Sequence, residues 1–146
     1  MTAYADTSAV VKLYADEPDS HLVRGDSHFV VSTLTRVEVA SAIWRKHRVG
    51  DLSTYEARLL IDTFLIDWAG KDATGPTFLP VAPAAIVLDA AVSLCGVHGL
   101  RAFDAVQLAS AVQARTADSS VSDFVTYDVG LHRAAAAEGF RVNPLT

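Results

Sequence analysis

The 146-residue sequence has little that would tie it to a membrane, a disulfide framework or a structural zinc site. Its one cysteine, Cys95, has no partner for an internal disulfide, and a single thiol argues against structural zinc. No apolar run approaches the roughly 20 residues of a membrane-spanning helix. Residues 1–6 lack the basic start and apolar stretch of a secretory signal. We therefore expect a soluble, cytoplasmic protein that does not associate with a membrane.

Positive charge is also scarce, because 12 Lys and Arg residues face 17 Asp and Glu residues, for a formal net charge of −5. This balance argues against a protein that coats nucleic acid by bulk charge, but not against one whose acids gather in a metal site. Hydrophobic residues make up 51% of the chain and charged residues 20%, which excludes a disordered chain. The length predicts one domain spanning residues 1–146.

Short β-like runs alternate with longer helical patterns, without an internal repeat. Strands are expected over residues 2–5, 29–31, 78–81, 124–126 and 140–142. Helices are expected over residues 8–14, 84–97, 102–115 and 131–138, with Pro83 in the first turn of the second of these. Two more helices are expected between the first and second, one from a Ser32 cap to near Gly50 and one from the capping box Ser53–Glu56 through Leu65. This alternation predicts an α/β fold in which helices flank a parallel sheet on both faces. Ligands of such sheets gather at the carboxyl ends of the strands.

Acidic residues lie at or near those strand ends, namely Asp6, Glu38, Asp104 and Asp128. Each also has a purely structural interpretation. Asp6 suits a helix cap, and Asp128 suits a turn. Glu38 suits a capping box begun by Thr35, and Asp104 suits a helix dipole or a pair with Arg101.

The neighbours of these acids favour a shared site. Apolar runs follow Glu38 and Asp104, and core-forming sequence flanks Asp6. Charged groups in such settings are unfavourable unless they are paired or bound to metal, and the sequence offers no fixed cation placed for all four acids. Converging carboxylates repel by up to ~4 kcal/mol per pair at about 4 Å with an effective dielectric near 20. A divalent cation relieves that repulsion, and oxygen ligands favour Mg²⁺ or Mn²⁺.

The sequence resembles the PIN domains, specifically the VapC-type ribonuclease toxins of bacterial toxin–antitoxin pairs. The matching segments, in order along the chain, are Tyr4–Tyr14, Leu34–Ala42, His98–Ala109 and Phe124–Asp128, followed by the similar ending Glu138–Pro144. Together they extend the resemblance over essentially the whole chain.

The resemblance implies a PIN-like nuclease domain over residues 1–146, with the acidic quartet of the family carried by Asp6, Glu38, Asp104 and Asp128. It implies Mg²⁺- or Mn²⁺-dependent hydrolysis of RNA phosphodiester bonds, with Asp6 and Asp104 as the most direct metal ligands. It also implies a homodimer and a cognate VapB-type antitoxin. Such antitoxins often place a basic side chain in the acidic site.

Polar residues near the acids have two interpretations. Three hydroxyl groups either support the acids by hydrogen bonds or serve only in caps and strand ends, those of Thr7, Ser8 and Thr126. Arg101 suits either a phosphate contact or a pair with Asp104. Lys12 is expected on a solvated helix face, and the run Arg45–Arg48 is expected to complement a helix dipole rather than to bind RNA.

Two other functions stay open. A phosphotransfer domain is one, although a haloacid-dehalogenase-like phosphatase needs a second Asp where this chain has Ser8. A response-regulator receiver needs a Lys after a late strand, where this chain has Thr126-Tyr127-Asp128. The other is an interaction module without nuclease activity, whose acidic pocket captures a basic peptide.

Overall fold

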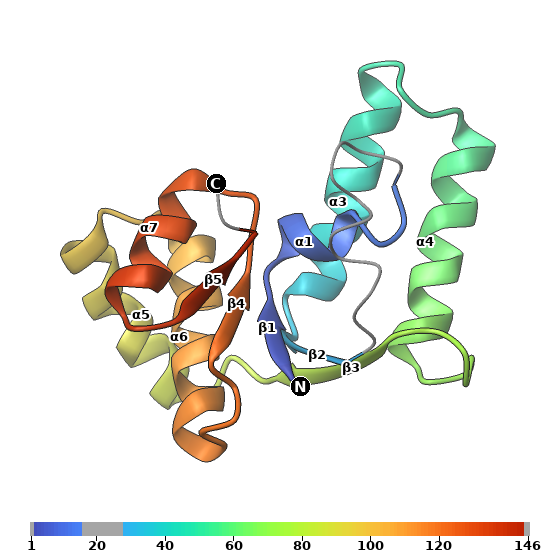
Figure 1. Cartoon of the computed structure of the whole chain (residues 1–146). Helices are drawn as coiled ribbons and strands as arrows, with labels where there is room; N and C mark the ends of the chain where they lie inside the picture. The colour runs from blue at the N-terminus through green and yellow to red at the C-terminus, as the bar shows by residue number, and fades with distance from the viewer. Residues whose placement is uncertain (1, 16–27, 145–146) are drawn as a thin grey trace.

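The computed structural model describes residues 2–15 and 28–144. Within them, five strands form one parallel sheet in the order β3-β2-β1-β4-β5 (Figure 1). The strands are β1 (Ala3–Ala5), β2 (His28–Ser32), β3 (Thr77–Val81), β4 (Asp123–Val125) and β5 (Arg141–Asn143). The helices are α1 (Thr7–Val11), α3 (Thr35–Arg48), α4 (Thr54–Trp68), α5 (Ala85–His98), α6 (Ala102–Ala117) and α7 (Val129–Ala137). The expected α/β class with a parallel sheet is confirmed.

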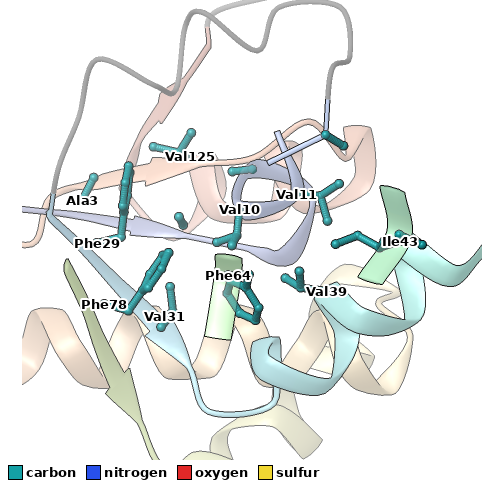
Figure 2. Close-up of a cluster of buried hydrophobic side chains, with 14 residues drawn as sticks. Ala3, Val10, Val11, Phe29, Val31, Val39, Ile43, Phe64, Phe78 and Val125 are labelled. Carbon is teal, nitrogen blue, oxygen red and sulfur yellow. The ribbon is translucent and has the colours of Figure 1, made fainter. Parts of the chain in front are cut away.

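Alternate side chains of the strands enter two separate cores, as the two-residue period of a strand requires. In β1, the two alanines face the core formed with α1, α3 and α4, whereas Tyr4 between them faces the opposite side. Figure 2 shows the first core, which includes Val10, Ile43 and Phe64 from these three helices and Phe29 from β2.

The second core lies between the other face of the sheet and α6 and α7, and α5 packs on α6. Tyr4 stacks there on Phe124 with ring centroids 5.1 Å apart, and Leu108 of α6 and Leu131 of α7 are fully buried beside them. The sheet is therefore covered by helices on both faces, as the alternating pattern predicted.

The strand order places a change of direction between β1 and β4. The chain runs outward from β1 through β2 to β3, and then returns to the other side of β1 to form β4 and β5. In open parallel sheets, the connections that leave two such strands diverge and open a crevice at their carboxyl ends. Asp6 directly follows β1, and Asp128 lies three residues after the end of β4.

Several local expectations are met and two need correction. The capping box of Ser53 and Glu56 is present, and Gly99 ends α5 with φ 65. The first helix stops at Val11 rather than at residue 14, and its chain continues in single turns. Pro83 precedes the Ala84 N-cap instead of lying in the first turn of α5.

Helix α5 carries four large apolar side chains that are exposed in the described part of the structure. The exposed large apolar residues of α5 are Ile86, Leu88, Val92 and Val97. No single helix among residues 2–15 and 28–144 is long and apolar enough to cross a membrane. Only α5 and α6 taken together pass by length and composition, and they meet at a bend of 116°.

Candidate active site

An open cleft of about 600 Å³ lies at the carboxyl ends of β1 and β4, and all four predicted acids line it. Asp6 follows β1, Glu38 comes from α3, Asp104 from the first turn of α6, and Asp128 from the N-terminus of α7. Residues separated by up to 122 positions in the sequence are thus brought to one place. The structure gathers the predicted set of acids in one cleft.

Asp6 is the most buried of the four, with 3% of its surface exposed. Its Oδ1 accepts hydrogen bonds from Ser8 Oγ (2.7 Å) and from the backbone N–H of Ala9 (3.0 Å), and its Oδ2 accepts one from Thr126 Oγ1 (2.6 Å). Asp6 therefore does cap α1, as its structural interpretation held, and it also lines the cleft. Burial raises the pKa of Asp6 to about 6, and the Asp128 charge adds a smaller increase. The three hydrogen bonds lower the pKa and offset part of this effect.

The Ser8 and Thr126 hydroxyls both support Asp6 and do more than cap local structure. Ser8 Oγ accepts the backbone N–H of Tyr127 (2.9 Å), and Thr126 Oγ1 accepts that of Asp128 (3.0 Å). These bonds tie the segment after β4 to the segment after β1. The two hydroxyls therefore fix the position of Asp128 relative to Asp6.

Glu38 lies one turn into α3 and does not form the expected capping box with Thr35. The N-cap of α3 is Leu34, and no side chain bonds to the first turn there. Glu38 Oε1 instead accepts a hydrogen bond from Gln107 Nε2 (2.9 Å) of α6. Burial raises the pKa of Glu38, and the Asp104 charge adds to that effect, whereas hydrogen bonds from Gln107 and Thr7 oppose it.

Gln107 is the functional residue that the sequence analysis missed. It is 2% exposed, and its amide nitrogen donates to Glu38 and to the hydroxyls of Thr7 and Thr35, both at 3.1 Å. Its amide oxygen accepts the Tyr4 hydroxyl hydrogen. A polar side chain three residues after Asp104, within an otherwise apolar run, was the available signal, because residues three apart share a helix face.

Asp104 and Asp128 complete the acidic wall of the cleft, and each retains a structural bond. Arg101 Nε lies 3.6 Å from Asp104 Oδ2, although the Arg101 side chain is 87% exposed. Such an exposed pair contributes little to stability. Asp128 caps α7, with Oδ1 accepting the backbone N–H of Leu131 (2.8 Å). Burial raises the pKa of Asp104, the Asp128 charge raises it further, and Arg101 lowers it.

Three of these acids thus have raised pKa values, and in each case a neighbouring acid contributes. Clusters of this kind are a mark of functional sites, since structural acids are more often stabilised in the charged form by cations or caps. The Tyr4 hydroxyl beneath the cleft also has a raised pKa, caused first by burial and then by the charges of Asp6 and Glu38. The cleft therefore holds an excess of negative charge close to its floor.

Cations line the same cleft as the acids, which corrects one expectation and adds to another. Lys12 is only 8% exposed, with Nζ 4.4 Å from the centroid of the Tyr127 ring, so it does not lie on a solvated helix face. Arg45 and Lys46 belong to the basic last turn of α3, as the helix-dipole interpretation expected, and they also line the cleft. The structure thus places three cations in the cleft that holds the acids.

The donor set fits a hard divalent cation that keeps part of its water shell. The cleft supplies carboxylate oxygens and hydroxyls, and neither His nor Cys lines it among the residues that the structure describes. Within the described residues, no three His, Cys, Asp or Glu side chains are close enough to hold an ion directly. Mg²⁺ is commonly bound through one or two carboxylates, with water and substrate phosphate as its other ligands. The cleft offers four such carboxylates.

Comparison with known proteins gives structural neighbours only. No family model matches the chain, and neither does any curated protein. A chain of a toxin–antitoxin complex from Klebsiella pneumoniae has a TM-score of 0.56 and 17% identity, with 86% of each chain covered. PAE2754 from Pyrobaculum aerophilum has a TM-score of 0.60 and 19% identity, covering 97% of this chain and 89% of that one. FitAcB from Neisseria gonorrhoeae has a TM-score of 0.56 and 18% identity, covering 97% and 96%. At these identities the likeness shows a shared fold.

Proposed function

We propose that this protein is a metal-dependent endoribonuclease that acts as the toxin of a toxin–antitoxin pair. One observation carries the proposal. Four acids from four separate elements line a single cleft at the carboxyl edge of a parallel sheet, beside a cationic wall. The VapC-like sequence segments support it, as does a fold shared with a chain of a toxin–antitoxin complex.

The residues of the cleft have separable tasks in this proposal. Asp6 and Asp104 hold a Mg²⁺ or Mn²⁺ ion, with Glu38 and Asp128 completing the acidic set. Such an ion, when bound, lowers the pKa of water and offsets the charge that builds on a phosphodiester during hydrolysis. Ser8 and Thr126 keep Asp6 oriented by their hydrogen bonds.

The remaining carboxylates orient the attacking water in this proposal. Glu38 is held in a fixed direction by the Gln107 amide, so a carboxylate oxygen that does not bind the ion can accept a proton from water. Its raised pKa suits that task, because a base with a pKa nearer to neutrality accepts a proton more readily.

The proposal includes two protein partners. A cognate VapB-type antitoxin restrains the toxin by placing a basic side chain among the acids, and the excess of carboxylates in the cleft favours such a group. A second copy of the chain forms a homodimer, which the uncovered apolar side chains of α5 support. The protein acts in the cytoplasm, where both its RNA substrate and its antitoxin are present.

A cleavage assay with antitoxin-free protein tests the enzymatic part. We expect RNA to be cut with Mg²⁺ or Mn²⁺ and left intact with EDTA, and the products to carry 5′-phosphate and 3′-hydroxyl ends, because water is the nucleophile. Asp6→Asn should abolish cleavage, whereas Asp62→Asn, an exposed acid on α4, should not. Expression of the parent protein, but not of Asp6→Asn, should slow the growth of a bacterial host.

Other outcomes separate the alternatives. Full activity in EDTA, or 2′,3′-cyclic phosphate ends, would contradict the metal-dependent mechanism. Binding of a basic peptide without any cleavage would favour the interaction module. Transfer of a phosphoryl group to the protein would favour the phosphotransfer domain. Asp6 is the carboxylate that would accept the group in such a domain, although both of its oxygens already accept hydrogen bonds.

A further inference from the structure

Phe103 is an aromatic side chain that the fold does not use. It is 60% exposed on the first turn of α6 and belongs to none of the buried clusters formed by the described residues. The buried residues of α6 begin two positions later, at Ala105. Phe103 nevertheless lines the acidic cleft, directly before Asp104 in the chain. Its ring is therefore available to a ligand bound in the cleft.

The cationic end of the cleft follows from the geometry of α3. Glu38, Ser41, Ala42, Arg45 and Lys46 all line the cleft, and their spacing of three and four residues places them along one face of the helix. At 1.5 Å rise per residue, Arg45 lies roughly 10 Å along the axis from Glu38. This separation suits two neighbouring phosphates of a strand, one at a cation held by the acids and the other at Arg45.

We propose that Phe103 is a stacking platform for an unpaired base beside the phosphodiester held at the acids, while Arg45 and Lys46 hold a neighbouring phosphate. Aromatic side chains bind bases of any sequence in this way, and cationic grooves follow the strand backbone. A base within a duplex has both faces covered by its neighbours, so only an unpaired base can cover the ring. The inference rests on the proposed ribonuclease function and identifies the residues that position its substrate.

Charge complementarity favours RNA over a basic peptide as the ligand of Phe103. A basic peptide is attracted to the acids but repelled by Lys12, Arg45 and Lys46, which line the same cleft. An RNA strand bound with a divalent cation satisfies both sides, because the cation bridges the acids and phosphate while the cationic wall contacts the next phosphate.

Binding measurements test the inference separately from cleavage. A fluorescein-labelled single-stranded RNA of twelve nucleotides is titrated in Mg²⁺ at low salt, with Asp128→Asn present in every protein compared so that cleavage is slowed, and the same strand annealed into a duplex is the second probe. Phe103→Ala should weaken binding of the single strand by about 5- to 150-fold, the range measured for loss of base–aromatic stacking. Phe103→Tyr keeps the ring and should bind as the parent does. Tyr55→Ala removes an aromatic ring that is 75% exposed on α4, outside the cleft, and should have no effect.

Salt dependence tests the cationic part. For single strands, the slope of log affinity against log salt falls by about 0.7 for each phosphate contact removed. Arg45→Ala and Lys46→Ala should each reduce the slope by about that amount, whereas Phe103→Ala should leave the slope unchanged.

Three results would overturn the inference. They are unchanged single-strand binding by Phe103→Ala, an equal loss for single strand and duplex, and a loss confined to binding of a basic peptide. Phe103-dependent RNA binding without cleavage in Mg²⁺ would instead refute the proposed hydrolysis and leave the stacking platform in place.

Discussion

Replacing Asp6 by Asn should stabilise the metal-free protein at neutral pH. The Asp6 carboxylate is buried, and its pKa of about 6 against an ordinary value of 3.8 shows that the fold opposes its charge. That difference of about 2 corresponds to roughly 3 kcal/mol at 1.36 kcal/mol per pH unit. Asn keeps the shape, the Ala9 cap and an oxygen that accepts from Ser8, but its NH₂ group cannot accept the Thr126 hydrogen bond that the acid accepts in either protonation state. We therefore expect a net gain of roughly 1–2 kcal/mol.

The pH dependence of this gain gives the more specific test. Below about pH 4, Asp6 is protonated in both the folded and unfolded states, so burial of the acid has no charge cost. Between about pH 4 and pH 6 the unfolded chain releases the proton first, and the parent protein loses stability as the pH rises. Well above pH 6, Asp6 is ionised in both states and the parent protein loses no further stability from this group. Asp6→Asn lacks this titration, so it should be roughly 1 kcal/mol less stable than the parent at pH 4, from the lost Thr126 hydrogen bond, and roughly 1–2 kcal/mol more stable at pH 7.

Thermal melts in EDTA at pH 4 and pH 7 measure the effect. For a domain of about 150 residues, a gain of roughly 1–2 kcal/mol raises Tm by about 2–8 °C. Mg²⁺ should then stabilise the parent more than Asp6→Asn, because a ligand that binds only the folded state stabilises it. Asp62→Asn, at an exposed position on α4, should change stability by no more than about 0.5 kcal/mol. A variant less stable than the parent at pH 7, by the same amount as at pH 4, would refute the reasoning and leave Asp6 as a helix cap only.

Two further predictions concern residues outside the acidic set. Gln107→Leu should lower stability by about 2–4 kcal/mol, because it leaves the buried hydroxyls of Tyr4 and Thr35 without the amide. It should also raise the pKa of Glu38, which carboxyl chemical shifts followed with pH would detect, and unchanged titration would contradict the assigned contact. Val92→Glu, on the exposed face of α5, should yield a monomer by light scattering at unchanged Tm. A dimer that persists in this variant would exclude that face of α5 as the interface.

Local patterns predicted most of the fold. The two-residue alternation of the short strands and the Ser53–Glu56 capping box act between residues near one another in the chain, so the sequence displays them directly. The acids were also predictable, because they follow strands whose carboxyl ends meet at one edge of a parallel sheet. Their gathering in one cleft is confirmed, whereas their binding of a metal ion stays a prediction.

The rest depends on contacts between distant residues. Gln107 bonds to Tyr4 and Thr7, about 100 positions away, and no local pattern reveals such partners. Lys12 looked like a surface residue because its neighbours indicated only a helix. In the structure it contacts the ring of Tyr127, which lies in the segment after β4 that is hydrogen-bonded to Ser8.

The Gln107 amide links a core residue to a cleft residue through its two ends. The carboxylate of Glu38 can only accept hydrogen bonds, so the NH₂ group of Gln107 faces it, which leaves the amide oxygen to accept the Tyr4 hydroxyl hydrogen. A ring packed in the second core thus supports the residue that holds Glu38. Changes at Tyr4 and at Gln107 are therefore linked. A lineage that replaces Tyr4 by Phe leaves the buried amide oxygen without this donor, and we expect a change at residue 107 to follow.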